Sequence, residues 1–222
     1  MNTASKSNVV RLSHVLEKEY GTISWYPRRD AINELVYTIL SQHTSDINSE
    51  RAFDNLITHF ESIEAISNAD ILEIQQCIKT AGLHKIKAER IKKVLNIIDA
   101  RIGGFDLSFL AEMPLEIAKS WLKSLPGIGP KTAAIVLCFS FGMPAMPVDT
   151  HIYRVSRRLG LIDSKASADK AHDLMEKIVD PDKIFPFHMY LIKHGRKVCK
   201  ALKPRCNECV VASMCPSRLK LS

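Results

Sequence analysis

The sequence has no run of about 20 apolar residues, which is the length that a membrane-spanning helix needs, in a chain of 222 residues. Its first residues, MNTASKSNVVRLSH, also lack the apolar centre of a secretion signal. These absences exclude a membrane partner and an exported protein. We therefore expect a soluble, intracellular protein of the cytoplasm.

The sequence also lacks the strict alternation of apolar and polar residues that half-buried strands show. Apolar residues instead recur at helical spacing, as in 32–40, 53–60, 91–98, 115–125 and 168–178. The segment 132–141, TAAIVLCFSF, is apolar on nearly every side, which predicts a buried central helix. The sequence therefore predicts an all-α fold.

Most of the chain lacks net positive charge, which is concentrated near the C-terminal end of the sequence. The net charge is +7, and residues 182–222 contain nine Lys or Arg and two acidic residues. The rest of the chain has 22 basic and 22 acidic residues. A basic segment of this kind is either a solvated surface or a surface that faces phosphates, since clustered cations release counterions from DNA.

The chain has six cysteines, and four of them lie close together. Cys77 and Cys138 stand alone in apolar helical contexts, so we expect both to be core residues. The other four follow the pattern C-x6-C-x2-C-x5-C: Cys199, Cys206, Cys209 and Cys215. In an intracellular protein such a group indicates a metal site rather than disulfides. Four thiolates suit either zinc or an iron–sulfur cluster, and ligand chemistry alone leaves both open.

The most informative stretch is LPGIGPKTA at 125–133, between an amphipathic helix and the buried helix. We expect Pro126 to stop the first helix and Pro130 to begin the second. Gly127 and Gly129 permit a positive φ and a close approach of another backbone. The free N–H groups of the turn then form an anion site that a DNA phosphate can reach. For a bare GxG, an ordinary packing corner is the alternative.

LPGIGPKTA between two helices resembles the helix–hairpin–helix of the endonuclease III superfamily of DNA glycosylases, and the similarity runs from about Ala31 to Pro216. The resemblance implies two helical domains with a DNA cleft between them. One is a six-helix barrel with the hairpin, at 29–143, and the other is an iron–sulfur domain formed by 1–28 and 144–222. It also implies a monomer whose partner is double-stranded DNA with damaged bases or abasic sites, at the nucleoid.

The same resemblance implies a cofactor for the four cysteines, because their spacing matches the [4Fe–4S] loop of this family. It thus favours an iron–sulfur cluster over zinc. The cluster is expected to be structural and to hold the segment 200–205 as a basic loop facing phosphates, with Lys200 as a DNA contact.

Lyase-active members of the family have a lysine at the position of Lys131 and an aspartate in a VDTH-type motif, here Val148–His151. The resemblance therefore implies Lys131 and Asp149 as the catalytic residues. The helix from Lys131 spans roughly 17 Å. An extended segment 142–148 reaches at most roughly 25 Å, so it can return Asp149 to Lys131. Asp149 is also a candidate N-cap, where its charged form is favoured.

The expected reaction begins when the lesion nucleotide flips out of the duplex. Asp149 assists departure of the base and activation of Lys131, which attacks C1′ and forms a Schiff base before β-elimination cuts the strand. A free lysine with a pKa near 10.4 is almost fully protonated. We therefore expect burial and the helix N-terminus to raise its neutral fraction. If each residue is considered by itself, the alternative for Lys131 is a solvent-exposed helix lysine, and the alternative for Asp149 is a helix cap without a catalytic role.

Two loops are candidates for the residues that fill the space left by a flipped base. In the first, 41–46, the family typically has glutamine where His43 stands, whereas Gln42 lies one place earlier, as in the adenine-glycosylase branch. We expect insertion of His43 with Gln42 beside it, and of Leu83 from the second loop, 81–84. His151 and Arg154 are expected near the DNA backbone. Alternatively, His43 is an ordinary loop histidine and Leu83 packs locally against its own loop. For His151 and Arg154 the alternative is the exposed face of a surface helix.

The sequence thus predicts a bifunctional DNA glycosylase and apurinic/apyrimidinic lyase that removes oxidised pyrimidines. One rival is a monofunctional glycosylase acting on mismatched adenine, or on uracil or thymine. The adenine branch usually lacks the lysine and has a further C-terminal domain, so Lys131 and the short tail after Cys215 count against it. The other rival is a non-catalytic iron–sulfur DNA-binding protein, which would not need Lys131 and Asp149.

Overall fold

The structure of the chain is a computed structural model that describes residues 6–218. These residues form helices and connecting loops with no strand, which confirms the predicted all-α class with two helical domains. None of the helices within 6–218 is both long and apolar enough to cross a membrane.

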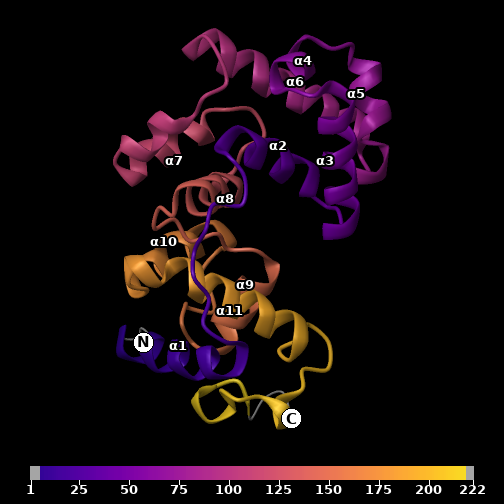
Figure 1. The fold of residues 1–222 in the computed structure, drawn as a ribbon. Helices are drawn as coiled ribbons and strands as arrows, with labels where there is room; N and C mark the ends of the chain where they lie inside the picture. The colour runs from indigo at the N-terminus through magenta and orange to yellow at the C-terminus, as the bar shows by residue number, and fades with distance from the viewer. Residues whose placement is uncertain (1–5, 219–222) are drawn as a thin grey trace. The chain divides into compact units, whose positions relative to one another are not determined.

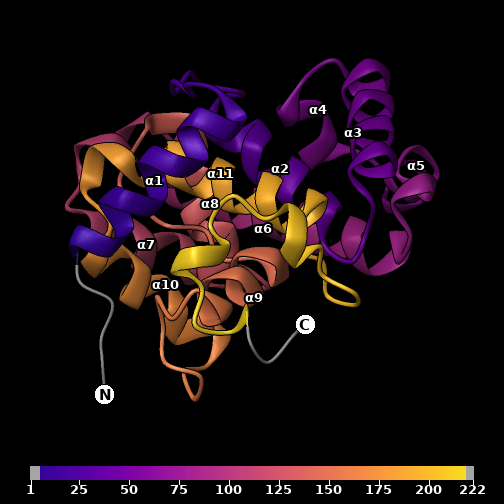
Figure 2. The same ribbon diagram turned by 90° about the horizontal axis from the view of Figure 1, so that it is seen from below.

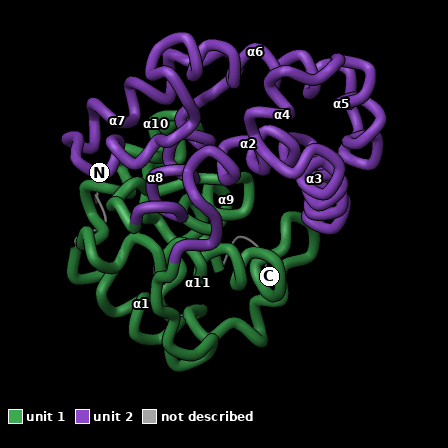
Figure 3. Tube along the Cα trace, turned by 45° about the horizontal axis from the view of Figure 1, so that its top comes forward, with its two compact units in different colours: residues 1–26, 142–222 green, residues 27–141 purple. Residues whose placement is uncertain are grey.

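The chain divides into two compact units, coloured separately in Figure 3. The hairpin unit consists of residues 27–141, and the cysteine unit consists of residues 1–26 and 142–222. These boundaries lie two residues from those of the domains expected from the sequence. Each unit is described by itself below.

The hairpin unit contains α2 to α8 and two short 3-10 helices (Figure 1). Their bounds are α2 Ala31–Ser41, α3 Asp46–Phe60, α4 Ile63–Asn68, α5 Ile71–Cys77, η1 Lys79–Ala81, α6 His84–Ile102, η2 Ser108–Glu112, α7 Leu115–Lys123 and α8 Pro130–Phe141.

Helix α8 lies at the centre of the hairpin unit's core, packed against α2 and α7. Helix α2 also packs against α3 and α6. Most of α8 is buried, as the apolar run predicts: Thr132, Ala133, Ala134, Val136, Leu137, Cys138 and Ser140. Burial of each large aliphatic side chain contributes about 1.5–3 kcal/mol, so this helix fixes the position of the turn that precedes it.

The cysteine unit combines the first helix with the last part of the chain. Helix α11 packs against both α9 and α1, and Figure 2 shows the segment after α11 returning past α9. The bounds are α1 Lys6–Tyr20, α9 Thr150–Arg158, α10 Ala168–Ile178, η3 Pro181–Lys183, α11 Ile184–Lys197, η4 Cys206–Glu208 and η5 Ala212–Met214.

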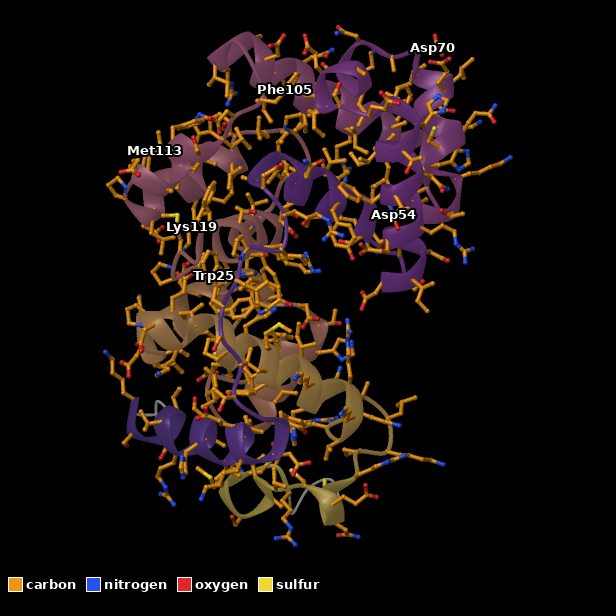
Figure 4. All side chains as sticks on the ribbon, viewed as in Figure 1. Trp25, Asp54, Asp70, Phe105, Met113 and Lys119 are labelled. Carbon is orange, nitrogen blue, oxygen red and sulfur yellow. The ribbon has the colours of Figure 1, made fainter. Side chains whose placement is uncertain are left out.

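Side-chain caps determine where several helices begin. The Asp70 carboxylate accepts a hydrogen bond from Leu72 N at 2.7 Å and starts α5. Figure 4 shows Asp70 and Asp54, both exposed, on the surface of the hairpin unit. The two isolated cysteines differ: Cys138 is buried as expected, but Cys77 is only half-buried. The expectation is wrong for Cys77 because this residue ends the short helix α5, where less of the unit covers it.

Candidate active site

The hairpin turn joins α7, which ends at Lys123, to α8, which begins at Pro130. Within it, Gly127 has φ +76°, a left-handed conformation that side chains disfavour. A Cβ at Gly127 would lie 2.3 Å from Arg90 Nε, so the guanidinium of Arg90 packs directly on the backbone here. The backbone angle therefore favours glycine at position 127, and a larger residue would also displace the Arg90 side chain.

Gly129 differs from Gly127 in both respects. Its φ lies outside the left-handed region, so of the two glycines only Gly127 uses the positive φ that glycine permits. Among the described residues beyond its chain neighbours, no atom lies within 4 Å of the place where a Cβ would stand. Because Ala133 N donates to Gly129 O at 3.0 Å and α8 begins at Pro130, Gly129 is the N-cap of α8, a position that does not call for a left-handed backbone.

Lys131 is the second residue of α8, and its side chain is exposed. The expected burial of this lysine is therefore wrong. The reason is helical geometry: the next three residues, 132–134, face the core, which leaves position 131 on the outer side of the first turn. Lys131 nevertheless lies in the first turn of α8, where the backbone N–H groups have no helical partners.

Gln42 connects the first predicted insertion loop to the hairpin. Its side-chain oxygen accepts a hydrogen bond from Arg90, and its amide nitrogen lies 3.5 Å from Thr132 Oγ1. Arg90 thus contacts both Gln42 and the turn at Gly127. The structure brings this loop beside the residue that follows Lys131.

The two predicted inserting side chains, His43 and Leu83, share an unusual backbone conformation. His43 has φ 54° and Leu83 has φ 47°, and both side chains are exposed, Leu83 by 55%. A left-handed residue other than glycine costs about 1–3 kcal/mol, and such strain gathers at functional sites. The two loops are also bonded to each other, since Thr44 Oγ1 donates to Ala81 O.

In the cysteine unit, Asp149 is the N-cap of α9, as expected. Its Oδ1 accepts a hydrogen bond from Ile152 N at 2.7 Å, and its side chain is half-buried. Asp149 and Lys131 belong to different units, so their pairing stays a prediction.

The segment before Asp149 is held by side chains that no sequence motif indicates. Met146 N donates to Glu176 Oε1 at 2.8 Å. Two buried histidines hold the neighbouring carbonyls: His172 Nδ1 lies 2.8 Å from Met146 O, and His188 Nδ1 lies 2.9 Å from Pro147 O. Their helix positions carry no sequence signal, because the histidines meet this segment only through the fold.

Two arginines join α9 to the cysteine segment. Arg154 donates from Nε to Cys199 O at 3.0 Å and from Nη2 to Gly195 O at 2.9 Å, and Nη2 lies 3.1 Å from His151 Nδ1. Arg158 Nη1 donates to Lys200 O at 2.7 Å, while the Lys200 side chain is exposed. The helix that Asp149 caps is thus bonded to the cysteine segment. DNA contacts of His151, Arg154 and Lys200 stay predictions.

The four clustered cysteines are free thiols that line one pocket together with Arg158, Arg205 and Arg218. Within 6–218, no three His, Cys, Asp or Glu side chains are placed to hold a metal ion. Burial raises the pKa of Cys209 and of Cys215, and repulsion from the neighbouring cysteines raises it further. Thiolates gathered in this pocket therefore need positive charge, which the three arginines supply in part.

The chain's similarity to known proteins covers both units. The family model "HhH-GPD superfamily base excision DNA repair protein" matches residues 36–181. "Endonuclease III" of Thermotoga maritima is 33% identical over 186 residues, which make up 84% of this chain and 83% of the relative.

Solved structures are similar over nearly the whole chain. "Structure of a Trapped Endonuclease III-DNA Covalent Intermediate" superposes with a TM-score of 0.83 at 26% identity, covering 98% of this chain and 99% of that one. A thermostable thymine-DNA glycosylase shares the fold, with a TM-score of 0.82 at 23% identity over 96% and 98% of the two chains. The fold alone therefore does not separate the two kinds of glycosylase.

With its open glycine turn leading into a buried helix, the chain belongs to the HhH-GPD superfamily of base excision DNA repair proteins. Within that superfamily it belongs to the endonuclease III family, as the identity over more than four fifths of both chains shows.

Proposed function

We propose that this chain is a bifunctional DNA glycosylase and apurinic/apyrimidinic lyase of base excision repair, acting as a monomer on double-stranded DNA at the nucleoid. The observation that carries the proposal is the start of α8, where an exposed amine at Lys131 follows an open backbone turn at Gly129. Family membership supports the same reaction.

The turn offers a DNA phosphate both space and donors. Gly129 adopts ordinary backbone angles and has open space in front of it, so nothing in the described chain requires glycine there. A ligand that approaches the backbone would explain why position 129 is glycine, since any side chain there would obstruct the ligand. The free N–H groups at the start of α8 favour an anion at this place. Gly127 shapes the turn, and Gly129 receives the phosphate.

Lys131 is the nucleophile of the proposed reaction. Its neutral amine attacks C1′ of the flipped nucleotide, and the bond from C1′ to the base breaks. The sugar ring then opens as O4′ takes up a proton, which gives a Schiff base. Water removes a C2′ proton while the C3′–O bond breaks and the 3′ phosphate leaves, and a second water hydrolyses the Schiff base and releases Lys131. When the substrate binds, Lys131 passes its proton to Asp149, and Asp149 gives that proton to the departing base, which leaves the carboxylate ionised as positive charge develops on the sugar.

The carboxylate of Asp149 has a second role on the same deoxyribose. Positive charge develops on the sugar as the base leaves, and an ionised carboxylate stabilises it. The N-cap position holds the carboxylate in place, because its Oδ1 accepts a hydrogen bond from Ile152 N at 2.7 Å.

We propose an oxidised pyrimidine as the damaged base, read by loops that replace it in the stack. His43 and Leu83 enter the duplex, and Gln42 lies beside His43. Their exposed left-handed backbones support this role. On the cysteine unit, His151, Arg154 and the exposed Lys200 contact the DNA backbone.

The four cysteines, Cys199, Cys206, Cys209 and Cys215, fit a [4Fe–4S] cluster. They line one pocket as free thiols with three arginines that offset negative charge, and four cysteine thiolates are the ligand set that such a cluster takes. When bound, the cluster supplies cross-linking of the segment rather than a step of the reaction. Iron content and visible absorbance of the purified protein test this assignment, and zinc with no visible absorbance would contradict it.

Borohydride reduction during the reaction tests the proposed function. The protein is incubated with duplex DNA containing an oxidised pyrimidine, and the Schiff base is reduced to a stable adduct. We expect an adduct with the wild type and none with Lys131→Gln, which keeps a long polar side chain but has no amine. Base release without an adduct would support the monofunctional glycosylase, and binding without either would support the non-catalytic DNA-binding protein.

A further inference from the structure

Lys87 is a buried cation on α6 that the reaction described above does not use. Only 2% of the residue is exposed, although lysine is almost never fully buried. Burial, together with the nearby charge of Arg90, lowers the pKa of Lys87 to about 8. Such a residue is kept only where its ammonium group has specific partners.

The ammonium group has three acceptors, one for each of its N–H donors. Lys87 Nζ lies 2.6 Å from Leu40 O, 2.6 Å from Thr44 Oγ1 and 2.8 Å from Ala81 O. Leu40 is among the last residues of α2, whose carbonyls lack helical partners, so a cation is favoured there. The hydrogen-bonding capacity of the group is therefore filled.

Two of these three acceptors come from the two loops that carry His43 and Leu83. Thr44 directly follows His43, and Ala81 lies two residues before Leu83. The backbone of Lys87 adds a fourth bond, because its N–H donates to Leu83 O at 3.0 Å. Lys87 thus bonds to the carbonyls of Ala81 and Leu83, which flank Gly82. It also bonds to the side chain of Thr44, the residue after His43.

The strain in the two loops explains why such a link is needed. His43 and Leu83 both have left-handed backbones, which relax to other conformations unless the surroundings fix them. The hydrogen bond from Thr44 Oγ1 to Ala81 O joins the loops directly. Lys87 Nζ donates to both of these oxygens, so the geometry of this bond depends on where the ammonium group lies. Fixing both loops from one buried point sets the position of one inserted side chain relative to the other.

We propose that Lys87 is a positioning residue that holds the two loops in register, so that His43 and Leu83 enter the DNA together. This inference rests on the proposed function, in which the two side chains fill the space left by the flipped nucleotide. Lys87 itself touches neither DNA nor the reacting sugar.

Three variants test the inference. Lys87→Met removes the cation but keeps an unbranched side chain of similar length. Thr44→Val removes one acceptor and the direct bond between the loops while leaving Lys87 in place. Lys93→Met is the matched control, because Lys93 is an exposed lysine on the same helix and its loss changes the net charge equally.

The readout is a duplex with an oxidised pyrimidine opposite 2-aminopurine, whose fluorescence rises when the opposing base is lost from the stack. We expect Lys87→Met and Thr44→Val to lose most of the fluorescence change. Single-turnover base release should slow by roughly 10²-fold, as expected for misplaced groups. Binding to undamaged duplex should be unchanged, because it depends on phosphate contacts. Lys93→Met should behave as the wild type in flipping and base release.

Wild-type fluorescence and base release in folded Lys87→Met would overturn the inference. If Lys87→Met does not fold, the same result in Thr44→Val overturns it. A wild-type protein that flips the nucleotide but forms no borohydride adduct would contradict the proposed function alone. The fluorescence of the variants would then still decide the role of Lys87.

Discussion

Asp149 Oδ1 accepts a hydrogen bond from Ile152 N at 2.7 Å, so the carboxylate proposed to act on the sugar also begins helix α9. The two roles need different properties of the side chain. The cap needs an oxygen acceptor, whereas stabilisation of a cationic sugar needs negative charge.

Substitutions of Asp149 therefore separate the roles. Asp149→Asn keeps a good capping oxygen and removes the charge, so we expect unchanged stability and base release slowed by about 10²–10³-fold. Asp149→Ala should show the same slowing and lose about 1 kcal/mol of stability with the cap. Single-turnover kinetics and urea unfolding measure the two effects. Wild-type base release by Asp149→Asn would contradict the catalytic role.

The two glycines of the hairpin should respond in opposite ways to alanine. At Gly129 a Cβ meets open space and the backbone is not left-handed, so Gly129→Ala should leave stability unchanged or raise it by about 0.4–1 kcal/mol. Its affinity for duplex DNA should fall, because the methyl group obstructs the phosphate. Thermal unfolding and a duplex-binding titration test this, and full affinity would exclude a phosphate contact at Gly129.

Gly127→Ala is the comparison for that experiment. A residue at φ +76° is strained, and the added Cβ would meet the side chain of Arg90. We expect a loss of stability above about 1 kcal/mol. Equal stability of the two alanine variants would show that the turn differs from the structure described.

Lys87 should leave a signature in the pH dependence of stability. Its pKa of about 8 in the folded protein lies below the value near 10.4 of an unfolded lysine. Between about pH 8 and 10 the unfolded chain therefore binds more protons at this residue, so its contribution to stability rises with pH. The difference in free energy of unfolding between wild type and Lys87→Met should change in favour of the wild type over this range. Parallel curves would contradict the lowered pKa.

Arg158 should be needed to retain the proposed cluster. Its guanidinium holds Lys200 O and Ala201 O and lies 3.4 Å from Cys199 Sγ. Arg158→Ala frees these carbonyls and removes positive charge from the pocket, so we expect lower iron content and faster proteolysis within 199–206. Arg157→Ala, an exposed neighbour on α9, is the control. Equal iron content in both variants would show that Arg158 does not support the site.

The sequence predicted features that depend on local order along the chain. The spacing of apolar residues predicted α2 and α8, and the residue type at 149 predicted a helix cap. Lys87, Arg158 and the histidine pair on α10 and α11 were not predicted, because each bonds to backbone atoms far away in the sequence. Carbonyl acceptors leave no pattern of residue types. The exposure of Lys131 likewise follows from how α8 is turned toward its neighbours.

The attachment point of the reduced adduct tests the central claim most directly. After borohydride trapping on an oxidised duplex, the protein is digested and the peptide that carries the sugar remnant is sequenced by mass spectrometry. The remnant should be found on the ε-nitrogen of Lys131, in the peptide that spans the start of α8. A remnant on any other amine, or no modified peptide in active protein, would show that the hairpin lysine is not the nucleophile.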